Sequence, residues 1–557
     1  MFIKLQKSKV SSKVYVHLVE GFRDDRGYPR QRVIRNYGEF SALEAQEPGF
    51  LEKLKAEAKE SSAAIKKAMT LEIDCLRQRN IGEHPLNYGH FFLEGIYRRL
   101  GLHTFLRKKA KFNTAYALSD IVELLVYARI ISPASKCTTF ESKDGYLRKF
   151  NFKIHDVYRT LRELNSLADD ICLHVHKQVT KRYRCDAHLV FYDVTNYYFE
   201  CDKEDGFRRR GASKEHRREP IVQMGLLIDD GGIPIAYRLF EGNTHDAKTL
   251  MPVLEELKHR YGFSRIVVVA DKGLNSKDNT DYINSVHNGY IVSQKVRGHV
   301  APEISAHIKD KSGWTFLDSG EFAFKSFLRK RQGANGHNFE EKVVCFWSAD
   351  YARREAYKRG ELVPAVESLV AHPARYEAIN DYGRKRYVKE IFVTEHGEMA
   401  KKKLVFDEER FKADAELDGF YCIITSEPDM ADLKIIDCYR GLSRIEESFR
   451  VIKSDLEGRP VYVWTRSHIN AHFLICFLAL VILRILQTKV NYSLSAEVIK
   501  EALSTATCTP LEKQYFTIEE TKNAYKKLED CFEVSLPNRY APIEVIKAYR
   551  KSILSKA

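Results

Sequence analysis

The spacing of apolar residues changes along the 557-residue chain and divides it into regions of different predicted structure. In residues 1–40, VYVHLVEGF and RQRVIRNYG flank the turn RDDRGYP, which predicts a small basic β-hairpin. From about 42 to 185, apolar residues recur at i, i+3 and i+4, as in FFLEGIYRRLGLHTFL and ALSDIVELLVYARII. This second region is therefore predicted to be mainly helical.

After residue 186 the pattern changes to short apolar runs separated by turns. The runs are AHLVFYDVTNYYFE, IVQMGLLIDD, GIPIAYRLFEGN and RIVVVADKGL, with a helical pattern at 247–262 before the last of them. Three strands, a helix and a further strand predict an α/β sheet with some antiparallel members. The continuous apolar run VVVA is typical of a strand that is covered on both faces.

Beyond residue 299 the chain is first polar and then strongly apolar. Residues 299–432 hold candidate strands such as KVVCFWS and GFYCIITS, and we expect a separate β-rich insertion there. Long helices are expected at 433–490, followed by a small helical tail. The most apolar run, Phe473–Leu483, has 11 residues, whereas a membrane span needs roughly 20. A buried core helix is therefore expected, with no membrane partner.

The composition narrows the class of partner. Lys and Arg number 90 against 76 Asp and Glu, a formal charge of +14, which favours a polyanionic partner such as nucleic acid. A basic protein without such a partner is the alternative, because net charge alone is weak evidence. The 11 cysteines form no CxxC pair, which argues against a zinc finger or a disulfide framework. MFIKLQKSKV has no apolar segment, so we expect a cytoplasmic protein without a secretory signal.

Two acidic residues stand at the ends of apolar strands. Asp193 lies in LVFYDVTNYYFE and Asp271 in IVVVADKG. A carboxylate at the end of an α/β strand is held at the sheet rim where ligands bind, and two from adjacent strands can share hard divalent cations. Each alone is weak evidence, because Asp also favours the turns that follow strands.

A third candidate acid lies in the predicted helix YRGLSRIEESFRVIKSDL, Tyr439–Leu456. At about 100° per residue, its buried stripe consists of Leu442, Ile445, Phe449, Ile452 and Leu456. Tyr439, Glu446 and Lys453 are seven residues apart and share a face beside that stripe. Glu447 points away from the stripe and is expected to be a solvated charge. The alternative for Glu446 is an ordinary surface pair with Arg450, four residues on.

These residues together resemble the DDE transposases of bacterial insertion sequences. The nearest resemblance is to the insertion-sequence-four superfamily, whose third acid lies in a helix motif of Tyr, Arg, Glu and Lys. Tyr439, Glu446 and Lys453 fit the spacing of that motif, YDVT and VADKG match the surroundings of the first and second acids, and GIPIAYRLFEGNTHD resembles the linking strands. Leu442 stands where the motif has arginine, and Arg440 or Arg444 is the candidate substitute. The resemblance covers about 186–490.

The resemblance implies an RNase H-like catalytic core, interrupted by a β-rich insertion, between a mainly helical N-terminal region and a helical C-terminal tail. It also implies that Asp193, Asp271 and Glu446 are catalytic and hold two Mg²⁺ or Mn²⁺ ions. The implied activity is cleavage at transposon ends followed by strand transfer into target DNA. The implied partners are double-stranded DNA and a second copy of the chain. The expected segments are 1–75 (basic β-hairpin plus helix), 76–185 (helical, candidate DNA-binding region), 186–298 (core, first part), 299–432 (β-rich insertion), 433–490 (core, second part) and 491–557 (helical tail).

Basic residues near these acids are the candidate DNA contacts. The resemblance assigns Tyr439, Lys453 and Arg444 to the DNA near the cut. The segment FRRRGASKEHRREP is strongly basic, and phosphate binding by this segment and by the end of GYIVSQKVR would be sensitive to salt. The candidates in these two segments are Arg208, Arg209, Arg210, Lys214, Arg217, Arg218, Lys295 and Arg297. A solvated loop is the alternative for each. Trp464 could stack on a base or belong to the core.

Two further hypotheses compete with an active transposase. One is a DNA-binding relic of such an enzyme that no longer cuts. The other is a metal-dependent nuclease of the same fold that does not join the cut end to a target. The presence of all three acids argues against the relic.

Overall fold

The computed structural model describes most of the chain. The described residues are 2–8, 12–23, 29–67, 84–110, 118–183, 188–211, 218–297, 302–317, 320–333, 336, 338–378, 382–393, 401–511 and 514–557. They divide into two compact units, Met1–Glu83 and His84–Ala557.

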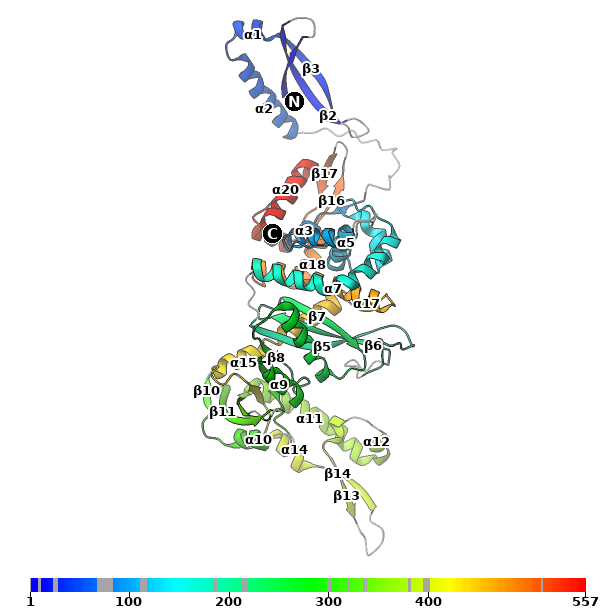
Figure 1. Ribbon diagram of the computed structural model, residues 1–557, viewed down its shortest axis with the longest axis vertical. Helices are drawn as coiled ribbons and strands as arrows, with labels where there is room; N and C mark the ends of the chain where they lie inside the picture. Colours follow the sequence, from blue (N-terminus) through cyan, green and yellow to red (C-terminus); the bar gives the residue numbers. More distant parts are fainter. Residues whose placement is uncertain are drawn as a thin grey trace. The chain divides into compact units, whose positions relative to one another are not determined.

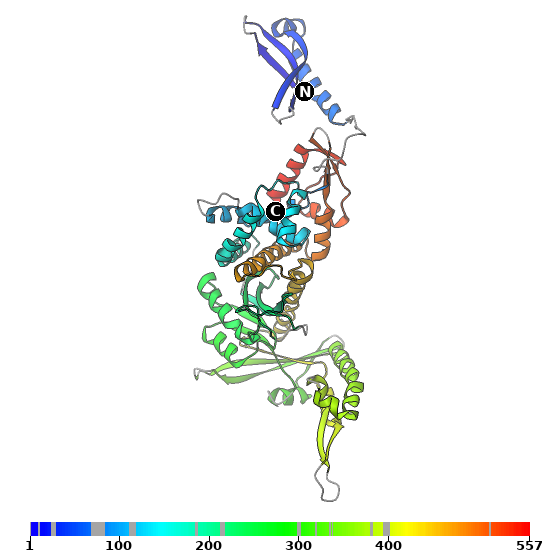
Figure 2. The same ribbon diagram turned by 90° about the vertical axis from the view of Figure 1, so that its right-hand side faces the viewer.

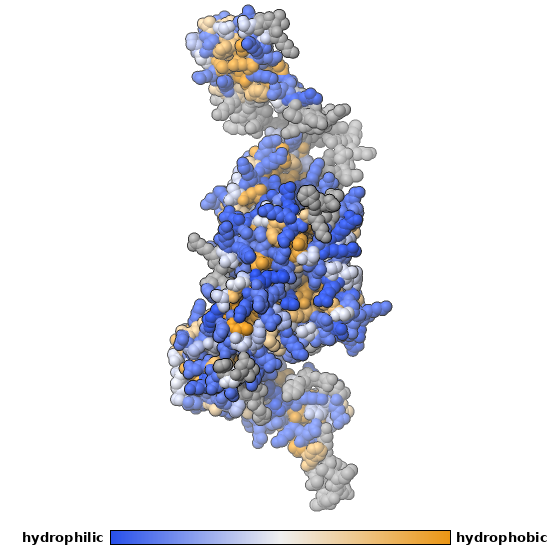
Figure 3. Space-filling view, in the orientation of Figure 1, coloured by the Kyte–Doolittle hydropathy of each residue, from blue (hydrophilic) through white to orange (hydrophobic). Residues whose placement is uncertain are grey.

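The first unit is a three-stranded antiparallel sheet with two helices. Its elements are β1 (Phe2–Lys7), β2 (Val14–Arg23), β3 (Pro29–Glu39), α1 (Phe40–Gln46) and α2 (Phe50–Lys67). Strands β2 and β3 pair as the hairpin expected from the sequence, and β1 adds a third strand. Val16 and Val19 of β2 and Leu54 of α2 are buried between sheet and helix. Apolar side chains also gather on the surface of this unit in the view of Figure 3.

The second unit contains a helical layer built around one apolar helix. The helices are α3 (His90–Arg99), α4 (Leu102–Lys109), α5 (Leu118–Ile131), α6 (Lys136–Glu141), α7 (Ile154–Tyr183) and α17 (Arg466–Lys489). Helix α17 packs against α7, α5 and α3 on one side and strand β7 on the other (Figure 1). It is long and apolar enough to cross a membrane, but 94% of its apolar window is buried in the protein. The burial agrees with the expected core helix.

The C-terminal segment joins this layer through a second small sheet. Its elements are α18 (Ala496–Thr505), β16 (Thr507–Pro510), β17 (Tyr515–Ile518), α19 (Asn523–Cys531), β18 (Tyr540–Pro542) and α20 (Ile543–Lys556). The sheet has the order β18-β17-β16-β4, with β4 at Leu86–Asn87. The tail contains the expected helices but also three short strands that the sequence did not predict, because runs as short as TCTP carry no clear period-2 signal.

A nine-stranded sheet forms the centre of the second unit. The first five strands are β5 (Leu189–Tyr198), β6 (Ile221–Asp229), β7 (Pro234–Glu241), β8 (Val267–Ala270) and β9 (Gly289–Gln294). They lie in the order β9-β8-β5-β6-β7, with β6 antiparallel to its neighbours and β8 and β9 parallel to β5. Helices α8 (Leu250–Glu256) and α9 (Lys277–Ser285) cover one face. The other face carries α17 and the helices that follow residue 431.

The insertion between β9 and residue 432 continues this sheet. Strands β10 (Thr315–Leu317), β11 (Phe322–Gln332), β12 (Asn338–Ser348) and β15 (Phe420–Thr425) extend it beyond β9 in the order β10-β11-β12-β15. Its remaining elements are α10 (Pro302–Lys309), α11 (Ala349–Ala371), α12 (Pro373–Ala378), α13 (Tyr382–Lys385), β13 (Val388–Val393), β14 (Lys401–Phe406) and α14 (Glu408–Ala415). Figure 2 shows the long strands of the insertion beside α11. The segment is the expected β-rich insertion, but only β13 and β14 form a sheet of their own, while the other four strands join the central sheet. Strand pairing along an edge leaves no mark in a hydropathy pattern.

Candidate active site and DNA interface

The register of three parallel strands sets Asp193 beside Asp271. Tyr192 of β5 pairs with Ala270 of β8, so the next residues of the two strands, Asp193 and Asp271, are also opposite one another. Neighbouring strands lie about 4.8 Å apart. Ala270 pairs in turn with Val292 of β9, which places Ser293 next in the row. Asp193, Asp271 and Ser293, here called the acid row, thus cross three adjacent strands where β8 and β9 end, level with the middle of β5.

The acid row belongs to the sheet face that carries α17. Side chains alternate between the faces of a strand. Phe191 and Tyr197 of β5 pack in the core on the α17 side, whereas Tyr192 and Val194 pack with α8 and α9. Asp193, with the parity of Phe191, therefore points to the α17 side. It is half-buried and its Oδ1 accepts from the amide of Val194 at 2.7 Å, while Asp271 is exposed.

Helices α15 (Asp432–Arg440) and α16 (Ser443–Arg450) cross this face above the acid row. Helix α15 packs on β15, β9 and β8, and α16 packs on β5 and β6. The close approach requires Gly441 between them, because a Cβ there would lie 2.6 Å from Cζ of Phe191. The helix that carries Glu446 therefore lies against the strand that carries Asp193.

Tyr439 of α15 reaches the second acid directly. Its hydroxyl donates a long hydrogen bond of 3.4 Å to Oδ1 of Asp271, and the hydroxyl of Ser293 donates to the same oxygen at 3.3 Å. Burial, and beyond it the negative charge of Asp271, raise the pKa of Tyr439. The phenol therefore stays protonated and remains a donor. Sequence reasoning missed Ser293, although its place next to last in the strand GYIVSQ would have suggested it.

The predicted single helix through Tyr439, Glu446 and Lys453 is wrong in its geometry. The helix breaks between Arg440 and Ser443, and residues Val451–Asp455 form a wider π-helical turn. Each change alters the angle per residue, so a seven-residue spacing no longer fixes one face. Lys453 nevertheless reaches the same sheet, with Nζ 5.6 Å from the ring centroid of Tyr197 on β5. The predicted buried stripe of Leu442, Ile445, Phe449, Ile452 and Leu456 is confirmed.

Glu446 and Glu447 differ in their partners. Glu447 Oε1 lies 3.3 Å from Nη1 of Arg484, whose side chain is only 2% exposed. The expectation that Glu447 is merely solvated is therefore wrong, because the apolar helix α17 contains a buried arginine that needs a counter-charge. Glu446 is exposed, and within the described residues Arg450 pairs with Asp455 rather than with Glu446. Glu446 is thus the glutamate left available for a ligand.

The chemistry of Asp193, Asp271 and Glu446 suits a hard divalent cation, since all three offer carboxylate oxygens. Their ligand atoms do not all converge within 4.8 Å in the described residues, where the single such group is His103, Asp120 and Glu123. A pair of cations does not require all three carboxylates to meet at one point. Metal binding by this trio therefore stays a prediction.

The His103, Asp120 and Glu123 group already holds a cation of the protein itself. Arg148 lies 2.8 Å from Oδ1 of Asp120 and forms an ion pair with the fully buried Glu123. His103 Nδ1 lies 2.8 Å from Glu123, and burial, with a smaller effect of Arg98, lowers the pKa of this histidine. A metal ion would have to displace the guanidinium. We interpret this group as a structural ion network.

The basic segment 207–220 is partly neutralised by its own neighbours. Arg208 pairs with Asp205 at 2.8 Å, Arg209 with Glu241 at 3.3 Å, and Arg210 donates to the carbonyl of Asp202 at 3.0 Å. Arg218 is exposed. Lys214 and Arg217 lie outside the described residues. The role of this segment in DNA binding stays a prediction.

The other candidate contacts differ in their availability. Lys295 is exposed after β9. Arg297 lies 2.9 Å from both Glu355 and Asp418. Burial opposes its charge, but the hydrogen bond to Glu355 and these carboxylates raise the pKa of Arg297 overall. Arg444 donates to the carbonyl of Asp230 in the β6–β7 turn. Arg297 and Arg444 thus already stabilise the fold, which weakens their assignment to DNA.

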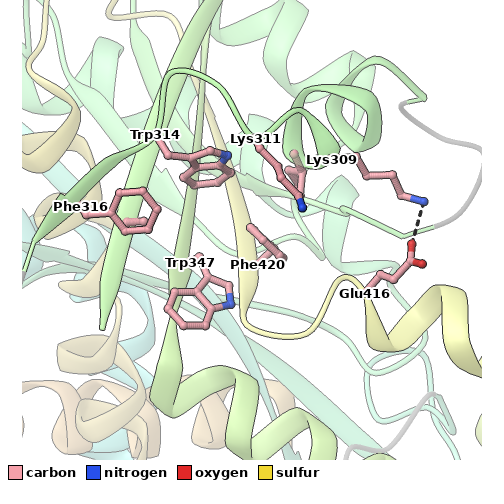
Figure 4. A pocket seen from close by; sticks show the side chains of 9 residues that line it. Lys309, Lys311, Trp314, Phe316, Trp347, Glu416 and Phe420 are labelled. Atoms are coloured by element: carbon pink, nitrogen blue, oxygen red, sulfur yellow. Dashed lines mark ion pairs between the residues drawn. The ribbon is translucent and has the colours of Figure 1, made fainter. Parts of the chain in front are cut away.

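An aromatic pocket of about 530 Å³ lies elsewhere in the second unit. Trp314, Phe316, Trp347 and Phe420 line it, and Lys309 pairs with Glu416 at 3.1 Å on its rim (Figure 4). Phe420 and Trp314 pack in the core on the α9 side of the sheet. The pocket therefore does not belong to the acid row, which faces the other way.

Two protein families match separate parts of the chain, one within each unit. Residues 184–482 match the family described as "Transposase DDE domain", and residues 3–68 match "IS1634 family transposase, N-terminal domain". No curated protein matches the chain. Among solved structures, the chain is similar to a piggyBac transposase synaptic complex with hairpin DNA at 9% identity and TM-score 0.35, covering 84% of each chain. It is also similar to a Mos1 transposase paired-end complex at 11% identity and TM-score 0.15, covering 42% of this chain and 66% of that one.

Proposed function

This chain belongs to the transposase DDE domain family and is a metal-dependent DNA transposase, and on that premise we propose that Asp193, Asp271 and Glu446 form its active site. The register that sets Asp193 beside Asp271 carries the proposal. Helix α16 supports it further, because it brings an exposed and unpaired glutamate to the strand of the first acid.

We assign strands β5 to β9 to an RNase H-like core. Three antiparallel strands, β5, β6 and β7, are followed by β8 and β9, which lie parallel to β5 on its other side. An acid on the first strand, an acid at the end of the fourth and an acid on a later helix would then be gathered at one site. The insertion between the fifth strand and that helix leaves this core order intact.

The three carboxylates would hold Mg²⁺ or Mn²⁺, most simply as two ions. When bound, such ions activate the attacking oxygen and stabilise the leaving oxygen of a phosphodiester. Asp193 and Asp271 would be fixed by the strands that carry them. Tyr439 and Ser293 donate to one oxygen of Asp271, which leaves its other oxygen for a ligand. The ammonium group of Lys453 would hold a DNA phosphate.

The order of events follows from the class of enzyme. Cleavage at a transposon end frees a 3′-OH, which then attacks target DNA. We propose a homodimer on DNA, since two ends must be joined together, and a cytoplasmic location close to the chromosome. Among the described candidates, Lys295 and Arg218 are exposed, and Tyr439 and Lys453 are kept for their places beside Asp271 and β5.

The test is cleavage of a duplex that carries the transposon end, with Mg²⁺ or Mn²⁺. We expect the wild type to cut and to join the cut end to a target duplex, and Glu446→Gln to lose at least about 10³-fold in cutting while it still binds the duplex. Glu497→Gln, an exposed glutamate at the start of α18, is the matched control and should cut normally. Absence of cutting by the wild type would contradict the proposal, and cutting without joining would favour the nuclease.

A further inference from the structure

An extended segment just after the π-helical turn turns two aromatic rings outward. Val461 and Val463 are buried, at 2% and 5% exposure, whereas Tyr462 and Trp464 are 60% and 53% exposed. This alternation is that of an extended chain anchored by its valines. Along such a chain the two aromatic residues are about 7 Å apart, so both rings are presented on the same side. Both rings leave apolar surface in contact with water, which is unfavourable. The pair is therefore unlike an ordinary core position.

Three arginines of this part of the chain lie over aromatic rings, one of them over Trp464. The guanidinium of Arg208 lies 5.5 Å from the ring centroid of Trp464, that of Arg459 lies 5.6 Å from Tyr198, and that of Arg466 lies 4.7 Å from Phe207. Each is within the range of a cation–π contact. We call Arg208, Arg459, Tyr462, Trp464 and Arg466 the aromatic strip.

Two more cationic side chains lie beneath the strip. Arg129 and Lys136 line a small cavity of about 10 Å³ together with Pro460 and Tyr462. Arg129 donates only to main-chain carbonyls, and neither residue forms an ion pair with a carboxylate of the described residues. Burial, and then the charge of Arg129, lower the pKa of Lys136 to about 7. Lys136 is therefore about half protonated at neutral pH, and Arg129 carries most of the positive charge beneath Tyr462.

The strip continues from the candidate active site along one strand. Lys453 lies over Tyr197 of β5, and Arg208 lies over both Trp464 and Phe199, the residue that follows β5. Tyr197 and Phe199 have the parity of Asp193, which lies six residues before Phe199, about 20 Å away at the rise of a β-strand. A DNA strand held at Asp193 would therefore reach the strip within a few nucleotides.

We propose that the aromatic strip binds an unpaired strand of DNA next to the cleavage point, with Tyr462 and Trp464 stacked on its bases and the exposed Arg466 on a phosphate. The inference rests on the proposed function for its position in the reaction. Stacking requires open base faces, and the faces within a duplex are closed by neighbouring base pairs, so the rings select unpaired nucleotides. Such a contact is tolerant of base sequence, since every base offers a face.

The experiment measures binding to the full chain by fluorescence anisotropy. The two labelled ligands are an oligothymidine of about 20 nucleotides and a mixed-sequence duplex of the same length. The chain carries Glu446→Gln and the buffer contains a chelator, so cutting plays no part. We expect the double variant Tyr462→Ala/Trp464→Ala to weaken single-strand binding about 5- to 150-fold for each ring, and duplex binding less than about threefold. Tyr462→Phe/Trp464→Phe should restore single-strand binding, because phenyl rings still stack.

The control is Tyr357→Ala/Phe392→Ala, which removes two rings that are each 68% exposed in the insertion. It should bind the single strand as the parent does. The proposal is overturned if the parent does not bind the single strand, if the Tyr462/Trp464 double variant binds within about twofold of it, or if the control loses as much. Wild-type cutting is scored separately. If the parent does not bind the single strand but the wild type cuts, the strip alone is overturned. If the parent binds the single strand through both rings but the wild type does not cut, the active site alone is overturned.

Discussion

Two clusters of acidic side chains in the second unit differ in how their charge is balanced. Around Glu123, which is fully buried, Arg148 of the loop before α7 supplies positive charge, and Nδ1 of His103 on α4 lies 2.8 Å from Glu123. At the end of β8, Asp271 is exposed, and its hydrogen bonds from the described residues come from the neutral hydroxyls of Tyr439 and Ser293. The first cluster is compact enough for a metal ion but already contains a guanidinium. The second is open and keeps a charge that a cation can use.

The comparison teaches that compactness is a poor guide to a metal site. A buried carboxylate must be paired, so a tight group of acids is expected wherever a helix bundle buries an arginine. A catalytic group needs a cation that can exchange and a substrate that can enter, which requires exposure. The glutamate pair repeats the contrast over one residue: Glu447 pairs with Arg484, and Glu446 is left open.

The largest expected effect is on cutting, from Asp271→Asn. The amide oxygen can still accept from Tyr439 and Ser293, but the charge that would bind a cation is lost. We expect a loss of at least about 10³-fold in cleavage of a transposon-end duplex, with an unchanged melting temperature. If the variant cut within about tenfold of wild type, the acid row would not be the metal site.

The opposite result is expected from Arg148→Met. This change removes the partner of Glu123 and Asp120 and leaves a buried carboxylate uncompensated. Unfolding in urea should show a loss of about 3–5 kcal/mol, with normal cutting per folded molecule. Arg107→Met, an exposed arginine of α4, serves as the control and should change stability little. A stable Arg148 variant that no longer cut would reverse the roles of the two clusters.

The smallest effect is expected from Glu447→Gln. Arg484 would keep its hydrogen bonds to Gln487 at 2.8 Å and Ser448 at 2.9 Å but lose its counter-charge. Because Glu447 is 42% exposed, water screens part of the pair, and we expect a loss of only about 1 kcal/mol. Cutting should persist, in contrast to Glu446→Gln. Loss of cutting in the Glu447 variant alone would show that the wrong glutamate has been assigned.

Much of the core was predictable, because strand runs such as IVVVA and the buried stripe from Leu442 to Leu456 are local signals. A strand end also gave Asp271, whereas Asp193 lies in the middle of β5 and not at its end, because β5 continues to Tyr198 beside β6. Three features were not predictable. The insertion strands join the central sheet by edge pairing, the helix at Tyr439 is broken and widened, and Arg484 lies hidden in an apolar run. Each depends on contacts between residues far apart in sequence, which periodicity does not report.

The most direct test of the central claim locates a bound metal on the chain. Fe²⁺ in place of Mg²⁺, with ascorbate and peroxide, generates hydroxyl radicals that cut the polypeptide next to the ion, and mass spectrometry maps the cuts. The account predicts cuts near Asp193, Asp271 and Glu446 that excess Mg²⁺ suppresses and that Asp271→Asn abolishes. Cuts near His103, Asp120 and Glu123 instead would contradict it.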